Sequence, residues 1–370
     1  MKSIKLLDTL EENKIIELGR GKVISKIEMN NNKGCFPVYS SAATGNGKFG
    51  EYGKYMFDDE RITWSIDGGG KFFYREKHKY SVTNVCGWIK INNPAMLNTK
   101  YVYYNLLNQW KYLSFDYVSK APPSKIKKVY SINIINLDKQ KKIVNDLDRV
   151  QQKIDINNDI LSNINELIKS QFVELFNDRF KGELIKLGDI AEFVIGLTYK
   201  PQNISKEGTI VLRSGNIQNN DLYLEDDIVK VSNINIPEHK FVKKNDILMC
   251  ARNGSARLVG KSCLINELNE KMSFGAFMTI IRSKFPYFLQ GFFLSEYFKS
   301  QLTGVATTTV NQITSGMLSN YKIIIPTDND ERVFSNFYKQ CDKLKFIVQQ
   351  RIDLLNELLN TKMHEYFDEE

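Results

Sequence analysis

The spacing of apolar residues divides this chain into stretches of two kinds. From residues 4 to 136, and again from 184 to 327, short apolar runs are separated by Gly and Asn clusters, which predicts strands and turns. After each stretch the apolar residues recur in steps of three and four, which is typical of a helix with one apolar stripe. The pattern therefore predicts two α+β domains, each followed by a long helix. The expected strands are Phe36–Tyr39, Arg61–Ile66 and Val85–Ile91 in the first domain and Thr209–Arg213, Asp246–Cys250 and Met278–Arg282 in the second, with a shorter helix over Thr99–Trp110 and another over Tyr287–Leu302.

The second half of the chain repeats the plan of the first. Residue n aligns with residue n + 191, so that Ser124–Asp178 matches Ser315–Glu369 without a gap. Two long copies indicate a pseudo-dimer within one polypeptide and not a solenoid, which needs three or more short units. The identities include Ser124/Ser315, Tyr130/Tyr321, Ile132/Ile323, Ile134/Ile325, Asn145/Asn336, Asn165/Asn356, Glu166/Glu357, Leu167/Leu358, Glu174/Glu365 and Phe176/Phe367.

Both long helices carry the a/d stripe of a coiled coil. The second has no Pro or Gly after residue 330, and some 40 residues at about 1.5 Å each give a rod of roughly 55 to 60 Å. The stripe of the first helix is Ile143, Leu147, Val150, Ile154, Asn157, Leu161, Ile164, Ile168, Gln171 and Leu175. The stripe of the second helix is Phe334, Tyr338, Cys341, Lys345, Val348, Ile352, Leu355, Leu359, Lys362 and Tyr366.

An apolar stripe is also compatible with a helix that packs only on its own domain. The repeat favours another arrangement, in which the two helices bury each other's stripes as an antiparallel pair. We therefore predict an α+β fold with a pseudo-two-fold internal repeat. Its parts are a first domain over 1–136, a central helix over 137–180, a second domain over 181–327 and a distal helix over 328–370. The predicted helix-pair interface is Leu147, Ile154, Asn157, Leu161, Ile164, Ile168, Val348, Ile352, Leu355 and Leu359.

The charge and the cysteines narrow the class of protein. The formal net charge of +8 favours a polyanionic partner such as nucleic acid, although a basic surface can also exist without one. The five cysteines are scattered without a C-x-x-C pair, and the N-terminus lacks a signal-peptide core, so we expect a cytoplasmic protein with reduced thiols. The most apolar stretch, 274–294, is interrupted by two charges and a proline, so no transmembrane segment is expected.

No catalytic motif stands out in the sequence. No Asn/Asp-Pro-Pro-Tyr/Phe loop of amino-methyltransferases is present, and Gly68–Lys71 is followed by Phe72 where a P-loop needs Ser or Thr. The Glu-x-Lys spacings at Glu12 and Glu238 lack the rest of a nuclease site. The three histidines are isolated, so no metal is expected.

Each domain instead carries a strand that runs into a Gly-containing, basic turn, Trp64–Lys71 in the first and Met249–Arg257 in the second. Backbone at glycine can approach phosphates, and arginine can hold a guanine edge with two hydrogen bonds. Such turns can also do no more than close hairpins. A second basic loop at 44–48, Ser119–Lys120 and residues 307–312 add further donors. The candidate DNA contacts are Lys48, Lys71, Arg75, Lys120, Arg213, Arg252, Asn253, Arg257, Lys261 and Asn311.

Two divergent domains, each followed by a similar long helix, resemble the specificity subunit of type I restriction-modification enzymes. The resemblance covers nearly the whole chain and includes Lys186–Ile190, Asn245–Leu248 before the Arg-Asn-Gly turn, and Asn311–Thr314 leading to Tyr321–Pro326. The first copy departs from the family's ending, because Asn136–Leu137 stands where the family often has Pro.

The resemblance implies a non-catalytic DNA reader. Each domain would read one half of a split, asymmetric DNA sequence, and the helices would set the unread spacer. The expected partners are double-stranded DNA, two modification subunits and, in some systems, two restriction subunits. S-adenosylmethionine, ATP and Mg²⁺ would belong to those partners, and this chain would hold no cofactor. A coiled-coil scaffold whose domains bind protein, and an enzyme with an unrecognised site, remain the alternatives.

Overall fold

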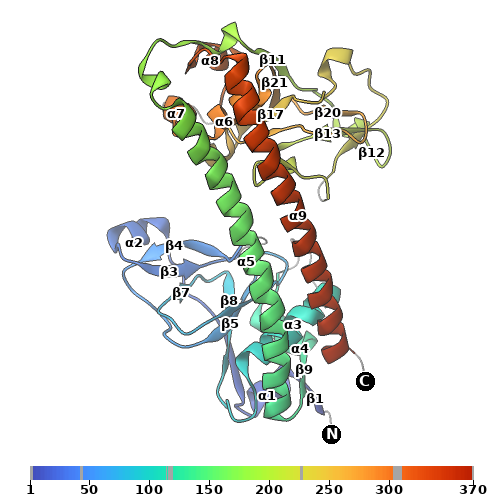
Figure 1. Cartoon of the computed structure of the whole chain (residues 1–370). Coiled ribbons are helices and arrows are strands. Elements are labelled where there is room, and N and C mark those ends of the chain that lie inside the picture. The colour runs from blue at the N-terminus through green and yellow to red at the C-terminus, as the bar shows by residue number, and fades with distance from the viewer. Residues whose placement is uncertain are drawn as a thin grey trace. The chain divides into compact units, whose positions relative to one another are not determined.

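The computed structural model describes residues 3–41, 45–113, 115, 120–225, 228–302 and 311–368. The chain forms two compact units, which we call unit 1 (Met1–Asp155 with Ile352–Glu370) and unit 2 (Ile156–Arg351). Each unit contains one α+β domain and a part of each long helix (Figure 1). The compact units therefore divide the chain within the helices, whereas the predicted domain boundaries lie between domains and helices.

The α+β domain of unit 1 is built on an antiparallel sheet with the strand order β2 (Ile16–Arg20), β8 (Cys86–Ile91), β5 (Arg61–Ser65), β6 (Phe72–Arg75). Every residue of β5 is buried, as expected for an inner strand covered on both faces. The remaining strands are β1 (Ser3–Leu6) paired with β9 (Ser131–Ile134), and a three-stranded sheet of β4 (Lys48–Tyr52), β3 (Phe36–Tyr39) and β7 (Ser81–Val82). The helices are α1 (Leu7–Glu12), α2 (Lys26–Asn31), α3 (Thr99–Leu113) and α4 (Pro123–Val129).

The α+β domain of unit 2 repeats this plan with the sheet β11 (Glu192–Ile195), β21 (Met278–Arg282), β17 (Ile247–Cys250), β19 (Ser262–Leu264). The second sheet has the strand order β12 (Ile204–Ser205), β16 (Lys230–Val231), β13 (Thr209–Leu212), β20 (Met272–Phe274). The two-stranded pairs of this domain are β10 (Ile185–Lys186) with β23 (Lys322–Ile323), β14 (Ile217–Gln218) with β15 (Asp221–Leu222), and β18 (Arg252–Asn253) with β22 (Asn311–Gln312). The helices are α6 (Pro286–Leu294), α7 (Glu296–Gln301) and α8 (Ser315–Asn320), with 3₁₀ turns at Arg179–Lys181, Leu187–Asp189, Pro201–Asn203, Ser214–Asn216, Glu238–Lys240 and Ala256–Leu258.

The internal repeat is visible in the strand pairing. β5 lies between β8 and β6 in one domain, as β17 lies between β21 and β19 in the other. The pair β3–β7 is parallel, and so is the pair β13–β20. In each domain the opening strand pairs with the closing strand, β1 with β9 and β10 with β23. The two domains therefore share the strand order of the main sheet and these two further pairings, whereas their second sheets differ in strand number.

One predicted helix differs from the structure. The stretch Tyr287–Leu302 is divided into α6 and α7, because Ser295 has an extended backbone (φ −82°, ψ 162°). Its backbone N–H donates to the Phe292 carbonyl at 3.0 Å and its hydroxyl to the same oxygen at 2.6 Å. A serine that bonds locally in this way competes with helical hydrogen bonds.

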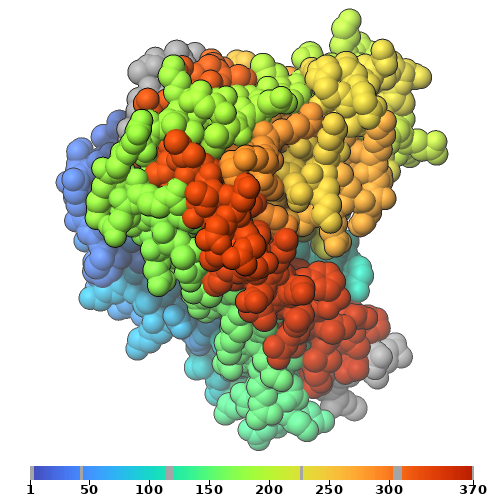
Figure 2. Space-filling model, turned by 45° about the horizontal axis from the view of Figure 1, so that its top comes forward, coloured from blue at the N-terminus to red at the C-terminus, as the bar shows by residue number. Residues whose placement is uncertain are grey.

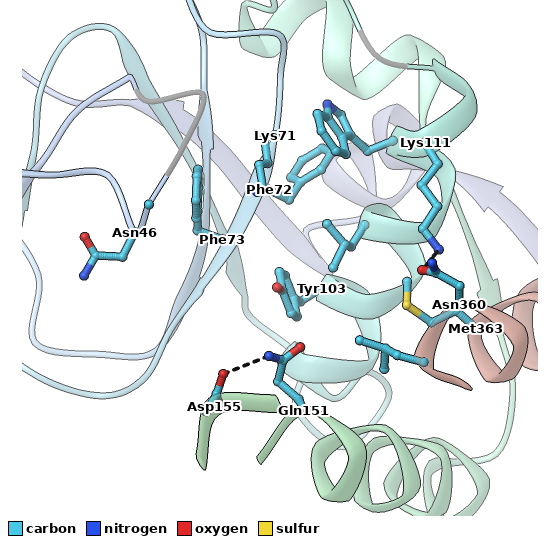
Figure 3. A pocket seen from close by; sticks show the side chains of 14 residues that line it. Asn46, Lys71, Phe72, Phe73, Tyr103, Lys111, Gln151, Asp155, Asn360 and Met363 are labelled. Carbon is cyan, nitrogen blue, oxygen red and sulfur yellow. Dashed lines mark hydrogen bonds between the residues drawn. The ribbon is translucent and has the colours of Figure 1, made fainter. Parts of the chain in front are cut away.

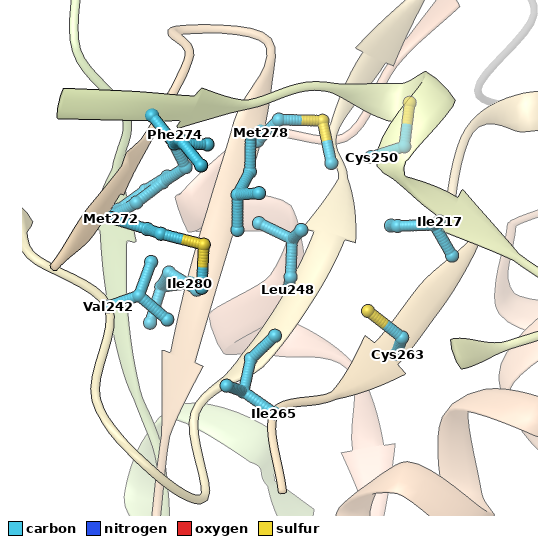
Figure 4. Close-up of a cluster of buried hydrophobic side chains, with 12 residues drawn as sticks. Ile217, Val242, Leu248, Cys250, Cys263, Ile265, Met272, Phe274, Met278 and Ile280 are labelled. Atoms are coloured by element: carbon cyan, nitrogen blue, oxygen red, sulfur yellow. The ribbon is translucent and has the colours of Figure 1, made fainter. Parts of the chain in front are cut away.

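A buried cluster forms the core between the two sheets of the second domain (Figure 4). Its members come from strands of both sheets and from the segments that join them, so burying them fixes the position of one sheet on the other. The cluster includes Ile217, Leu248, Cys250, Cys263, Met272, Phe274, Met278 and Ile280, all at most 1% exposed.

The two long helices are α5 (Leu137–Phe176) and α9 (Asp328–Phe367), each of 40 residues and related by the same offset of 191 as the sequence repeat. Within unit 1, the Tyr366 hydroxyl donates to Asp146 at 2.9 Å, so the end of α9 lies beside the start of α5. Within unit 2, the Phe172 and Phe334 ring centroids are 5.5 Å apart, so the end of α5 lies beside the start of α9. The helix segments are thus antiparallel in each unit, which confirms the predicted α+β fold with two long helices.

The apolar stripe is buried along most of its length. Nine of the ten residues named for the helix-pair interface are buried, and Leu355 is half-buried. The stripe shifts by one residue near the helix ends, where Phe172 (0% exposed) and Met363 (1%) replace the expected Gln171 and Lys362. The predicted Leu175 is 38% exposed, and Phe176 is buried in its place. A helix with 3.6 residues per turn drifts from a strict seven-residue repeat, which accounts for the shift.

Candidate nucleic-acid interface

Three segments of the second domain that are distant in sequence meet at the end of β17. Directly after β17, the short strand β18 pairs antiparallel with β22, placing Arg252 opposite Gln312 and Asn253 opposite Asn311. The Asn253 side chain donates to the Ser214 hydroxyl at 3.3 Å, which holds the turn after Arg213 against β18. We call Arg213, Arg252, Asn253, Arg257, Lys261 and Asn311 the β17 cluster; all six were predicted as DNA contacts.

The cations of the β17 cluster differ in exposure. Arg252 and Arg257 are exposed, whereas Arg213 and Lys261 are half-buried. Burial lowers the pKa of Lys261. Within the described residues, no carboxylate lies within ion-pair distance of Arg252, Arg257 or Lys261. In the part of the chain that the structure describes, these three cations therefore have no carboxylate ion-pair partner, which suits them to attract phosphate.

Sequence reasoning missed one residue of this surface, Phe277. Its ring is 59% exposed and lies 5.3 Å from the Arg252 guanidinium. The Phe277 carbonyl accepts backbone N–H groups of Ala251 and Arg252 at 2.9 and 3.0 Å, which fixes this turn to the β17 cluster. An exposed aromatic ring beside arginines can stack on a base. The sequence offered one feature that could have indicated Phe277, namely an aromatic residue in the Gly275–Phe277 turn before a buried strand.

In the first domain, the equivalent place is the turn between β5 and β6. Gly69 and Gly70 have φ angles of +77° and +75°, which only glycine adopts without strain. A Cβ atom on Gly70 would lie 2.8 Å from the Phe115 ring, and the Gly69 carbonyl accepts the Trp110 indole N–H at 2.7 Å. These glycines serve the packing of the turn, whereas the sequence had suggested that they admit a phosphate.

The first-domain turns that carry candidate lysines lie close to each other. The Ser40 backbone N–H donates to Gly47 at 2.9 Å, and the Asp67 N–H donates to the neighbouring Ser41 hydroxyl at 3.0 Å. Lys120 is exposed, and its ammonium lies 3.5 Å from Asp67.

The other two candidate lysines of the first domain, Lys48 and Lys71, differ in their surroundings. The Lys48 ammonium lies 2.8 Å from Glu51, whose hydrogen bond and charge raise the pKa of Lys48. Lys71 is half-buried, with its ammonium 5.8 and 5.9 Å from the Phe73 and Trp110 rings.

Arg75 was predicted to contact DNA, but the structure places it in the domain interior. It is 6% exposed, its Nε donates to the Thr63 hydroxyl at 3.0 Å, and its guanidinium lies 3.7 Å from the Tyr39 ring. Burial lowers its pKa. Arg75 is therefore held by Thr63 and Tyr39 inside the domain, and its position suits a structural role. The candidate residues 44, 119 and 307–310 lie outside the described residues.

In the described part of the chain, no group of three or more His, Cys, Asp or Glu side chains is arranged to hold a metal ion. None of the described helices has a stretch long and apolar enough to cross a membrane.

The family model of the type I restriction modification DNA specificity domain matches residues 9–166 and 181–358. The chain belongs to this family. Its two matches correspond to the two copies of the domain and helix, so the internal repeat is a repeat of the family's own unit.

Curated relatives come from Mycoplasma pneumoniae. S.MpnORF507P, named as a type I specificity subunit, is 32% identical over 208 residues, which cover 52% of this chain and 54% of the relative. S.MpnORF285P, with the same kind of name, is 33% identical over 129 residues, covering 34% of this chain and 42% of the relative. The chain spans about half the length of the curated relatives it matches.

A distant likeness extends to a solved structure. The crystal structure of a type I restriction-modification system S subunit from M. genitalium has a TM-score of 0.48 and 14% identity, covering 98% of this chain and 95% of that one.

Proposed function

We propose that this family member is the DNA sequence-specificity subunit of a type I restriction-modification complex and is itself non-catalytic. The observation that carries the proposal is the double match to the specificity domain, with a basic turn after the same central strand in each copy. One domain would read one half of a bipartite, asymmetric target and the other domain the second half. Arg252 and Arg257, which have no carboxylate partner among the described residues, support direct contact with DNA in the second half-site.

The long helices would set the unread spacer between the half-sites. A helix of 40 residues is about 60 Å long. One turn of B-DNA advances about 34 Å, so domains carried on such helices can reach major grooves about one turn apart. Helix length should then fix spacer length.

The same helices would dock two modification subunits. The apolar residues Ile156, Ile160 and Leu167 of α5 are 57%, 37% and 50% exposed, and their spacing of four and seven places them on one helix face. Ile347 and Leu358, the repeat equivalents of Ile156 and Leu167, are 51% and 43% exposed on α9. Figure 2 shows α9, in red, uncovered on the face in view. Uncovered apolar side chains on both copies support two equivalent partners.

Those partners would supply the chemistry in the cytoplasm. Modification subunits would bring S-adenosylmethionine and methylate adenine, and restriction subunits, where present, would bring ATP and Mg²⁺. This chain would supply sequence recognition alone, consistent with a candidate surface made of Arg, Lys and Asn.

An exchange of domains tests the proposal. Residues 184–327 are replaced by the corresponding domain of another family member, and adenine methylation is mapped by single-molecule sequencing in cells that contain the modification subunit. One half-site should change while the other half-site and the spacer stay the same. A change in both halves would contradict independent reading. If the unaltered complex showed no salt-sensitive binding to DNA, the result would favour the alternative of a protein-binding scaffold.

A further inference from the structure

Unit 1 contains a hollow of about 500 Å³ that the proposed function does not use (Figure 3). Its walls come from the first domain, from α3, from Gln151 and Asp155 near the middle of α5 and from the end of α9. Figure 3 shows Lys111 reaching to Asn360 and Gln151 turned to Asp155. A hollow of this size lies within the range of small-molecule sites, about 300 to 1,000 Å³.

One part of the lining is aromatic and positively charged. The half-buried rings of Phe73, Tyr103 and Trp110 line it, and the Lys71 ammonium lies 5.8 Å from the Phe73 ring and 5.9 Å from the Trp110 ring. Lys111 adds a second ammonium, hydrogen-bonded to the neutral Asn360 side chain at 2.8 Å. Within the described residues, neither lysine lies within ion-pair distance of a carboxylate.

Another part of the lining offers hydrogen-bond acceptors. Asp155 is exposed and accepts from the Gln151 side chain at 2.9 Å, which leaves carboxylate acceptor capacity for a ligand. The hollow thus combines flat apolar rings, positive charge and an acceptor group within one volume.

The second copy provides an internal comparison. A hollow of about 360 Å³ in unit 2 is lined by Lys169, the repeat equivalent of Asn360, together with Asn219 and Asn220. No aromatic residue lines it, and Lys169 is paired with Glu166 at 2.6 Å. Among the described residues, the combination of aromatic rings with lysines that have no carboxylate partner therefore occurs in the hollow of unit 1 and not in that of unit 2, so it is not a consequence of the shared fold.

We propose that the hollow of unit 1 binds a purine nucleotide. The base would lie against Phe73 and Trp110, the phosphate would lie at Lys71 and Lys111, and the exocyclic amino group of an adenine would donate to Asp155. Each part of the ligand meets a group of matching chemistry: rings stack on bases, ammonium groups attract phosphate, and a carboxylate accepts from an amino group.

A nucleotide could reach this hollow from two sources. It could be free in solution, or it could be a nucleotide turned out of a DNA duplex, which rests on the proposed DNA-reading function. The two sources use the same contacts and are separated by the following measurements on the full chain.

The first measurement is titration with AMP and with ATP while tryptophan fluorescence is recorded. Of the three tryptophans, Trp110 alone lines the hollow, so a free nucleotide should give a saturable change that Trp110→Phe abolishes. Phe73→Ala should weaken binding roughly 5- to 150-fold, as expected when one stacking ring is lost. The matched control is Tyr112→Ala, which removes a 69% exposed aromatic ring of the same helix α3 outside the hollow.

The second measurement places 2-aminopurine, whose fluorescence rises when it leaves the stack, at successive positions of the target duplex, without modification subunits. If the nucleotide comes from a duplex, 2-aminopurine fluorescence should rise at one position. Phe73→Ala should remove this rise and Tyr112→Ala should keep it, while both variants retain their affinity for the duplex. Circular dichroism establishes that each variant is folded. A response in either measurement that is lost only in Phe73→Ala supports the site. If neither measurement responds, or if both variants respond alike, the proposal is overturned. Duplex binding with no response in either measurement would overturn this site and leave the proposed function intact.

Discussion

Lys345 provides the sharpest test of how the second domain is held on the helices. It is 5% exposed within the apolar stripe of α9, where the first copy has Ile154. Its ammonium lies 3.2 Å from both carboxylate oxygens of Asp221 and 3.7 Å from Asp342. Lys345→Met should keep the apolar packing and leave the two carboxylates without their shared cation.

The expected loss can be estimated from the geometry. At 3.2 Å and an effective dielectric constant of about 20, one ion pair corresponds to about 5 kcal/mol before the cost of desolvation. Removing one partner of a buried pair costs about 3 to 5 kcal/mol. The side chains of Asp221 and Asp342 are 45% and 21% exposed, so water offsets part of that cost. We expect Lys345→Met to lower the free energy of unfolding by about 2 to 4 kcal/mol at pH 8.

The loss should depend on pH. Burial raises the pKa of Asp342 to about 6 even with Lys345 present, so removal of the cation should raise it further. At pH 5 Asp342 can then become neutral by protonation, and the cost should fall to about 1 kcal/mol.

The assay is urea unfolding followed by far-ultraviolet circular dichroism, with amide hydrogen exchange of peptides covering 217–222 and 342–348. Tryptophan fluorescence would not serve, because Trp64, Trp88 and Trp110 all belong to unit 1. Lys343→Met, an exposed neighbour on the same helix, is the control and should change stability by less than about 0.5 kcal/mol. Equal stability of the wild type and Lys345→Met at pH 8 would show that the buried charges are not coupled.

Further predictions concern the same unit. Because the folded-state pKa of Asp342, about 6, exceeds the ordinary value of 3.8, its contribution to stability is fully present below about pH 4 and is lost as the pH rises through 6. In the wild type, this group should lower the free energy of urea unfolding by up to about 3 kcal/mol between pH 4 and 7. Asp342→Asn should remove this decline, and a variant with the same pH profile as the wild type would contradict the prediction. Ile168→Ala, at a side chain that is 0% exposed, should cost about 2 to 5 kcal/mol by thermal or urea unfolding, whereas Leu167→Ala, at 50% exposure, should cost far less. Arg257→Ala should cost about 1 to 3 kcal/mol in binding and relax specificity in one half-site if Arg257 reads a base; uniform weakening across DNA sequences would make it a phosphate contact.

Local signals in the sequence predicted much of the fold. The change of apolar spacing from two to three and four predicted where strands give way to α5 and α9, because each element buries one face with its own period. The offset of 191 related two helices whose bounds differ by that same number. Inner strands such as β17 are continuous apolar runs, since both of their faces are covered.

The candidate site could be predicted only in part. The sequence indicated Arg252, Asn253 and Asn311 as donors, but it could not indicate that β18 pairs with β22, because strand pairing between distant segments is set by the whole sheet. It misassigned Arg75, because the inward or outward direction of a side chain depends on strand register. It overlooked Phe277, because exposure of an aromatic ring is not encoded by its identity.

The sequence alone thus determined the repeat, the two long helices and the positive charge, since these depend on residue type and spacing along the chain. Among the described residues, the tertiary structure decided which cations have a carboxylate partner, as Lys48 does in Glu51 and Arg252 does not. It also decided that the rings of Phe73, Tyr103 and Trp110 share one hollow with side chains from α9. Such properties depend on distances between segments remote in sequence, and those distances are fixed only when the domain packs on its helices.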